Sequence, residues 1–184
     1  MKKILLIFLA FLCLQNIRAQ IERAGGGLAF STGVDFNTIE TGNPGFFGKA
    51  YIKVLEDTYL VPTLTVFNRY KRSTVIHSFT NYMFQADLDV QYEFLQEGPL
   101  RVVGFAGING TGILSKYEIF IGESVYDDDA GIKPGLNLGG GVEMYIDKSL
   151  DSVLSAKYIV GPWNQFVIQL SVIYHFYGRK RIGW

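Results

Sequence analysis

The sequence has almost no cysteine. Its single cysteine, Cys13, lies inside an apolar N-terminal segment. A chain that has lost this segment therefore has neither a disulfide framework, nor a thiol nucleophile, nor a zinc–thiolate site. The bulky residues Phe11 and Leu12 directly before Cys13 argue against lipid attachment there, because such a motif requires small residues.

The sequence also lacks an excess of basic charge. The chain carries 17 basic and 17 acidic side chains, and loss of Lys2, Lys3 and Arg18 with the N-terminal segment leaves a mature chain of 14 against 17. A charge near −3 provides no basic field, so we expect no nucleic acid partner.

Long apolar runs are confined to the start of the chain. Lys2 and Lys3 precede an apolar run over Ile4–Leu14, and the small residue Ala19 follows it. This order is typical of a cleavable export signal, and the run is too short to span a bilayer as a helix. We predict a signal peptide at 1–19 and a single domain at 20–184.

Alternation of apolar and polar residues is abundant. In Tyr82–Phe94 every second residue is apolar or aromatic, and the residues between them are almost all polar. A strand turns successive side chains to opposite faces, so the segment predicts a ribbon with one apolar and one polar face. At a rise of about 3.3 Å per residue and a tilt of about 45°, it covers roughly 30 Å, which is the thickness of a hydrocarbon core.

Similar patterns predict eight strands and no helix after the signal. The connections alternate between long and short, except that the last one, Gly161–Asn164, is small. This order is typical of barrels with long extracellular loops and short periplasmic turns. We therefore predict an all-β fold, an eight-stranded up-and-down antiparallel transmembrane β-barrel. Pro62 lacks an N–H donor and predicts a bulge. The expected strands are Gly27–Phe36, Phe47–Glu56, Tyr59–Tyr70, Tyr82–Phe94, Leu100–Asn109, Leu136–Ile146, Ser152–Val160 and Gln165–Tyr177.

The alternation assigns opposite charges to one interior. An eight-stranded barrel is filled by its own side chains, so these charges are expected to pair in the lumen. The predicted ion-pair network comprises Lys49, Lys53, Asp87, Asp89, Glu93, Arg101, Glu143 and Lys157. The predicted lipid-facing set comprises Phe84, Leu88, Val90, Leu138, Val142, Leu170 and Val172. The alternatives are a solvated sheet face for the charges, and a soluble barrel with the apolar faces inward.

The C-terminal part of the chain resembles a known family. The segments NLGGGVEMYIDKSLDSVLSAKY and QFVIQLSVIYHF resemble the last hairpins of small outer-membrane β-barrel proteins of the OmpX/OmpA-like porin superfamily, particularly the outer-membrane β-barrel domain proteins of Bacteroidetes. The last strand is similar to the assembly signal of that class, with Gln169, Ser171, Tyr174 and Phe176 at its positions. Ser171 stands where glycine is frequent, and the chain continues past its final aromatic to Trp184.

The resemblance implies a fold and a location more than an activity. It implies an integral protein of the outer membrane that contacts outer-membrane lipid and lipopolysaccharide, and that uses the barrel-assembly machinery during biogenesis. Relatives of this type have structural, adhesive or host-contact roles.

Catalytic and ligand motifs are weak. The glycine runs Gly25–Gly27 and Gly139–Gly141 lack the Lys-Ser/Thr of a phosphate loop. Asp127–Asp129 lacks the spacing of a calcium loop and reads as a solvated loop tip. His77 and Ser78 fall in an expected loop. In a strand, adjacent side chains point to opposite faces, so the two residues could not act together in catalysis there. We expect no catalysis, no cofactor and no metal.

The segment Gly110–Gly135 is the candidate contact loop. Tyr117, Ile119 and Ile121 alternate with Glu118 and Phe120, a short strand pattern that extends the barrel wall, and its free edge can capture a partner strand. The alternatives are a loop that covers the mouth, or two further strands, which makes ten. The expected function is structural or surface interaction, adhesion or host contact, with an extracellular protein ligand. The competing hypotheses are a narrow passive pore for small solutes and a soluble exported barrel that binds an apolar ligand.

Overall fold

The computed structural model describes residues 21–32, 43–68, 70–73, 77–119 and 126–176. These residues form nine strands and, within the described ranges, no helix. The strands are β1 (Ile21–Ser31), β2 (Asn43–Leu55), β3 (Thr58–Phe67), β4 (Tyr70–Ser73), β5 (His77–Glu97), β6 (Leu100–Ile119), β7 (Tyr126–Asp147), β8 (Leu150–Val160) and β9 (Gln165–His175). The predicted signal peptide lies outside the described residues.

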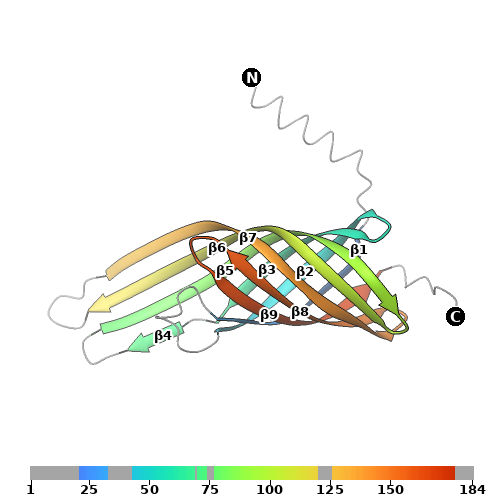
Figure 1. The fold of residues 1–184 in the computed structure, drawn as a ribbon. Helices are drawn as coiled ribbons and strands as arrows, with labels where there is room; N and C mark the ends of the chain where they lie inside the picture. The colour runs from blue at the N-terminus through green and yellow to red at the C-terminus, as the bar shows by residue number, and fades with distance from the viewer. Residues whose placement is uncertain (1–20, 33–42, 69, 74–76, 120–125, 177–184) are drawn as a thin grey trace, which may run out of the picture.

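The strands close into an eight-stranded antiparallel barrel. Strands that follow one another in sequence are paired, except that β3 pairs with β5 and not with β4, and β1 pairs with β9 to close the barrel. The short strand β4 follows β3 and pairs with the outer part of β5, so β3 and β4 together occupy one position in the wall. Up-and-down topology and closure were both predicted and are confirmed (Figure 1). The alternative of ten strands around the barrel is wrong.

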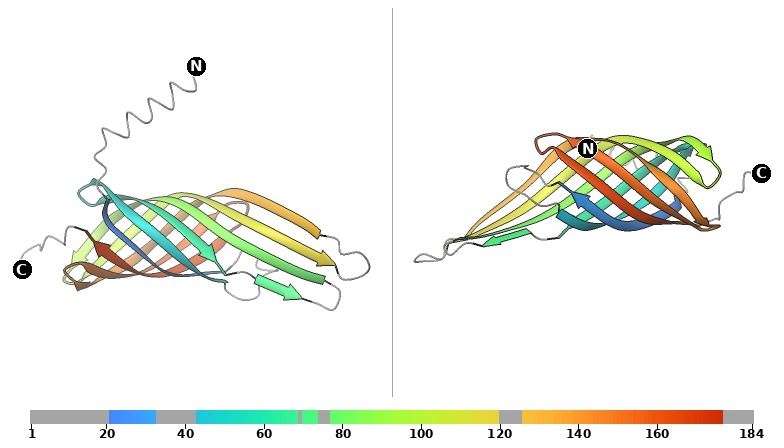
Figure 2. Two further views of the ribbon diagram at one scale, coloured as in Figure 1. Left: turned by 180° about the vertical axis from the view of Figure 1, so that it is seen from behind. Right: turned by 60° about the horizontal axis from the view of Figure 1, so that its bottom comes forward.

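Alternating side chains produce the two faces of this wall. In β9, for example, every second residue from Gln165 to His175 is buried, and the residues between them are exposed. The same alternation runs through β2, β3, β5 and β8. Strands cross the barrel obliquely (Figure 2), as closure of a sheet of this size requires.

Three two-residue turns form one end of the barrel. They lie at Glu56–Asp57, Gly98–Pro99 and Lys148–Ser149. Gly98 has a φ of 56°, a left-handed conformation that favours glycine. All four shifts of register lie beside this end, in the outermost residues of β1, β2, β5 and β7. Such bulges are common at barrel rims.

No such shift occurs at Pro62, so the bulge predicted there is wrong. The register between β2 and β3 is the same on both sides of Pro62, although the ladder lacks the pairs between Lys49–Thr63 and Ile52–Leu60. On its other side Pro62 pairs in register with Leu88 of β5. The missing donor therefore interrupts one ladder locally without inserting a residue.

At the opposite end β5, β6 and β7 continue far beyond the other strands (Figure 1). β6 and β7 stay paired out to Glu118 and Tyr126, whereas β8 ends where Val160 pairs with Leu136. The predicted loops at Lys71–Asn81 and Gly110–Gly135 are therefore largely strand. Charges and glycines obscure the alternation there, and hydrogen bonding across long hairpins overrides that local signal. We call β4 and the outer parts of β5, β6 and β7 the protruding sheet.

No helix in the described part of the chain is long and apolar enough to cross a membrane.

Candidate functional site

The lumen near the short turns contains a cluster of two arginines and two glutamates. Arg23 contacts Glu143 at 2.7 Å and Glu93 at 2.8 Å, and Arg101 contacts both carboxylates at 2.9 Å. Gln91 donates a further hydrogen bond to Glu143 at 3.0 Å. Two positive and two negative charges are thus paired inside the barrel, which offsets the cost of removing them from water. We call these five residues the lower cluster.

Arg23 also lies between two aromatic rings. Its guanidinium carbon is 4.3 Å from the ring centre of Tyr51 and 4.4 Å from that of Tyr59. The two rings meet edge to face at 6.2 Å. Because Arg23 is only 1% exposed, these cation–π contacts are desolvated and add to the ion pairs.

A second polar cluster fills the middle of the lumen. Lys157 contacts Asp87 at 2.6 Å, and Asn109 and Asn137 donate to the same carboxylate at 2.6 and 3.0 Å. Asn137 also donates to Asp89 at 2.8 Å. Side chains from four strands, β5 to β8, therefore share one hydrogen-bonded set, which we call the upper cluster.

Toward the long loops the lumen becomes amide-lined and then apolar. Gln85 donates to Gln165 at 2.7 Å, and Ser31 donates to the same oxygen at 3.1 Å. An apolar cluster of inward residues lies around this end, with Ile113 packed against it: Ala29, Phe47, Phe67, Met83, Ile159 and Val167. The lumen is filled by side chains along its length, as expected for eight strands.

Seven of the eight residues in the predicted ion-pair set lie in the lumen. Six belong to the two clusters, and Lys49 is enclosed on β2 between them. Lys53 differs: it is 42% exposed at the rim and lies 3.8 Å from Glu22, so its assignment to the enclosed network is wrong. It stands on the lumen side of β2 but beyond the point where the wall encloses it.

Arg23 and the rim pair His175–Asp151 are absent from the predicted set. His175 Nε2 lies 2.8 Å from Asp151 on the neighbouring strand. The expected first strand began at Gly27, because three consecutive glycines interrupt the alternation. Extension of the alternation backwards through Gly25 would have placed Arg23 inside.

The outer surface carries an apolar band. All seven residues of the predicted lipid-facing set are exposed, from 38% at Phe84 to 68% at Leu138. Aromatic side chains stand at both borders, Tyr82 and Phe84 at one and Tyr92 and Phe94 at the other. Ten residues separate the border pairs on β5, which at a tilt of about 45° is roughly 24 Å, close to the 25 Å band of outer-membrane barrels.

This orientation excludes the arrangement that a soluble barrel requires. Asp87 is buried at 6%, whereas its neighbour Leu88 on the same strand is 39% exposed. The charges are enclosed and the hydrocarbon side chains face out, so the barrel is built to be surrounded by lipid.

The residues of the expected assembly signal occupy both faces of β9 and its end. Gln169 and Ser171 point into the lumen, whereas Tyr174 and Phe176 are half-exposed on the outside. The two rings meet edge to face at 5.6 Å. They stand at the short-turn border of the apolar band.

Two of the four expected contact residues fall on the protruding sheet. Tyr117 and Ile119 belong to β6, while Phe120 and Ile121 lie outside the described residues. Asp127–Asp129, expected in a loop tip, and His77 and Ser78, also expected in a loop, are in strands β7 and β5. No group of three or more metal-ligating side chains is present in the described ranges.

Comparison with solved structures identifies the fold. The N-terminal barrel domain of OprF from Pseudomonas aeruginosa matches with a TM-score of 0.58 at 15% identity, over 84% of this chain and 98% of that chain. Ail, the attachment invasion locus protein of Yersinia pestis, matches with a TM-score of 0.60 at 14% identity, over 85% of this chain and 100% of that chain. Ail in complex with the heparin analogue sucrose octasulfate matches with a TM-score of 0.61 at 15% identity, over 85% of this chain and 100% of that chain.

The chain is an eight-stranded barrel of the outer-membrane type. No family model and no curated protein matches the sequence, so the likeness lies in the fold. The apolar outer band of this chain, on that fold, places the barrel in the outer membrane. The predicted eight-stranded up-and-down barrel is confirmed, with short turns at one end and, in place of the loops predicted at Lys71–Asn81 and Gly110–Gly135, long hairpins at the other.

Proposed function

We propose that this outer-membrane barrel is a non-catalytic surface-interaction protein and that the protruding sheet is its contact element. The barrel anchors the chain in lipid, and the sheet carries the contact beyond the membrane. The expected ligand is an extracellular protein, and the role is adhesion or host contact.

The observation that carries the proposal is the length of the protruding sheet. β7 runs from Tyr126 to Gly135 without a partner on the β8 side among the described strands, a distance of roughly 30 Å at about 3.3 Å per residue. Such an edge presents backbone donors and acceptors that a second strand can pair with. Among the described residues, Trp163 covers this edge near its base, where its ring lies 6.0 Å from the Lys133 ammonium and packs beside Gly131.

The sequence of the sheet supports a protein ligand over a sulfated glycan. Ail has been solved with a heparin analogue, which makes such a glycan worth testing here. In this chain, however, the part of β7 without a β8 partner contains three consecutive acidic residues, Asp127–Asp129, whose negative charge disfavours a polyanion. The pairing of β6 with β7 brings Tyr117 beside Asp127, so aromatic and acidic positions adjoin.

The filled lumen supports an anchoring role over a passive pore. Both polar clusters are paired across the interior, and an apolar cluster lies at the long-loop end. A hydrophobic constriction of this kind opposes ion passage. We expect no stable conductance from the purified protein in planar bilayers.

Biogenesis and lipid contacts complete the proposal. Tyr174 and Phe176, exposed beside the polar Gln169 and Ser171 on the inner face, form the segment that the barrel-assembly machinery would recognise. The exposed aliphatic and aromatic residues of the outer band would contact lipid and, in the outer leaflet, lipopolysaccharide.

A shortened hairpin tests the contact element. Leu114 pairs with Ala130, so joining them through an Asn-Gly turn removes the end of the β6–β7 hairpin without changing register. We expect cells that display this variant to lose adhesion to extracellular matrix proteins, while the barrel keeps its different gel mobility with and without boiling. Undiminished adhesion with normal assembly would refute the proposal. Retained binding to heparin but not to proteins would identify a glycan ligand instead.

A further inference from the structure

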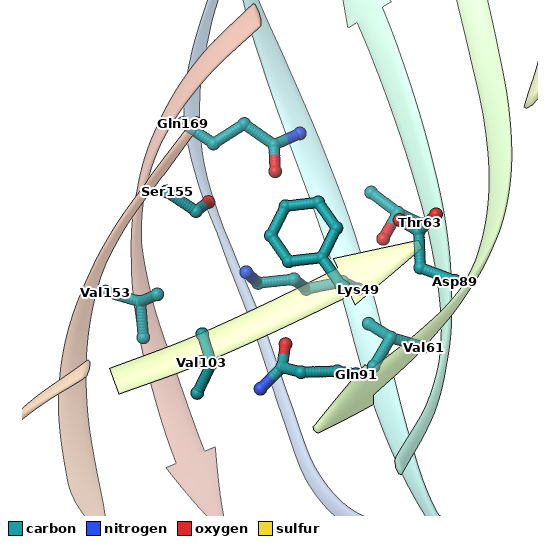
Figure 3. Close-up of a pocket in the computed structure, with 10 residues that line it drawn as sticks. Lys49, Val61, Thr63, Asp89, Gln91, Val103, Val153, Ser155 and Gln169 are labelled. Carbon is teal, nitrogen blue, oxygen red and sulfur yellow. The ribbon is translucent and has the colours of Figure 1, made fainter. Parts of the chain in front are cut away.

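A small pocket lies in the lumen between the lower and upper clusters. Its polar lining comes from Lys49, Thr63, Asp89, Gln91, Ser155 and Gln169, and four apolar side chains complete it. Figure 3 shows Lys49, Gln91 and Gln169 reaching into the lumen from three different strands. The pocket offers about 20 Å³ to the centres of water-sized molecules. One water molecule needs roughly 10–15 Å³ by this measure, so the space suits one.

Two opposite charges without a direct ionic partner line this pocket. Arg23 and Arg101 pair with Glu93 and Glu143, and Lys157 pairs with Asp87. Of the charged side chains that line the pocket, these pairs leave Lys49 and Asp89. Lys49 has cation–π contacts with Phe47 at 5.4 Å and with Tyr51 at 5.5 Å, and Asp89 accepts from Asn137. No ion pair joins Lys49 and Asp89 within the described lumen, although both are at least nine-tenths buried.

The amide of Gln169 supplies an independent sign of a bound molecule. Gln169 is 94% buried, and its Nε2 atom has no hydrogen-bond partner within the described chain. An amide donor that is buried without a partner loses its hydrogen bond to water and destabilises the fold. It faces the same pocket as Lys49 and Asp89.

We propose that this pocket binds a structural water molecule that bridges Lys49 and Asp89. The water accepts from the Lys49 ammonium and from Gln169 Nε2, and it donates to Asp89 and to the carbonyl oxygen of the Gln91 side chain. Two donors and two acceptors match the bonding capacity of water. A bound anion fits less well, because the Asp89 carboxylate repels it.

This water links the two clusters. Gln91 belongs to the lower cluster through Glu143, and Asp89 belongs to the upper cluster through Asn137. With the water in place, one hydrogen-bonded network runs from Arg23 to Lys157. Lys49 then acts as the charge that neutralises Asp89 across one solvent molecule.

Nuclear magnetic resonance of the intact protein in lipid nanodiscs tests the site directly. We expect the side-chain amide protons of Gln169 to show cross peaks to a long-lived water. The side-chain amide of Gln85, which donates directly to Gln165, serves as the control and should show none. Absence of the Gln169 signal would overturn the proposal. Bromide density in the pocket of crystals grown with bromide would overturn it in favour of an anion.

A double-mutant cycle tests the coupling between the two charges. Lys49→Met and Asp89→Asn should each lower the folding equilibrium constant at least tenfold, because each leaves one buried charge uncompensated. The double variant should lose at least threefold less than the product of the single losses. The directly bonded pair Lys157 and Asp87, changed in the same way, should show stronger coupling. If the double variant's loss in folding equilibrium constant equals the product of the two single losses, a bridge between Lys49 and Asp89 is contradicted. The double variant remains measurable if a single variant does not fold.

Discussion

Replacement of Arg23 with methionine is the most demanding test of the lumen. The change keeps much of the side-chain volume but removes one charge from two carboxylates, Glu93 and Glu143. Loss of one partner from a buried pair costs about 3–5 kcal/mol. Arg101 still reaches both carboxylates, which favours the lower end, whereas loss of the stacking on Tyr51 and Tyr59 adds about 0.5–2 kcal/mol for each ring. The lower end of about 3 kcal/mol, with the lower value for each ring, gives an expected total loss of about 4 kcal/mol.

Unfolding by urea in phospholipid vesicles measures this loss. For an m-value of about 1–3 kcal/mol/M, a loss of about 4 kcal/mol lowers the midpoint by roughly 1.3–4 M. Arg23→Lys keeps the charge but cannot bond two carboxylates through a planar fork, so we expect about half the loss. Lys53→Met removes a cation from the exposed pair at the rim and should cost no more than about 0.5 kcal/mol.

The contrast between Arg23 and Lys53 decides the outcome. A loss below about 1 kcal/mol for Arg23→Met would mean that water screens the lower cluster as it screens a surface pair. The assignment of a desolvated, paired interior would then be wrong, and so would the expectation that the lumen does not conduct.

Three further predictions concern the wall. Leu88→Arg should cost about 2–4 kcal/mol in bilayers, since it puts a charge on the lipid side, whereas Leu88→Met should be nearly neutral; equal losses would contradict the assigned face. Gly107→Ala should cost about 1–3 kcal/mol in the same unfolding assay, because the new methyl group meets the Leu88 carbonyl oxygen. Gly48→Ala is the control: the atom nearest to its new methyl group is 3.9 Å away, so stability should change by less than about 0.5 kcal/mol. Phe176→Ala should slow assembly in cells, seen as unfolded chain in pulse labelling, and unchanged assembly kinetics would exclude a signal at this position.

Much of the wall followed from alternation alone. Where one face met charges and the other met hydrocarbon, as in Tyr82–Phe94, period-two patterning predicted both the strand and its orientation. The same argument failed at Gly25–Gly27, where glycine has no side chain to mark a face, and Arg23 was therefore missed. It failed again at Asp127–Asp129, because outside the membrane both faces of a strand are polar and the pattern carries no period.

The contacts of the site depended on register, which single-strand patterns do not contain. The alternation showed that Asp87 and Lys157 face the same interior, but only pairing through β6, β7 and β8 places their atoms 2.6 Å apart. Lys53 was misassigned for the same reason. The alternation predicted its lumen-side face correctly, but its height along the barrel is set by the turn at Glu56–Asp57 and could not be predicted from one strand.

The seam between β1 and β9 ties closure of the barrel to completion of the polypeptide. β1 pairs with β9 from Arg23 opposite His175 to Ser31 opposite Val167, so the earliest strand made waits for the last. A prematurely terminated product that stops before Gln165 keeps the pairing of β1 with β2 but leaves the other edge of β1 and one edge of β8 unpaired. Unpaired backbone groups at the strand edges therefore distinguish an unfinished chain from a finished one. Periplasmic quality control could use this difference without recognising any particular side chain.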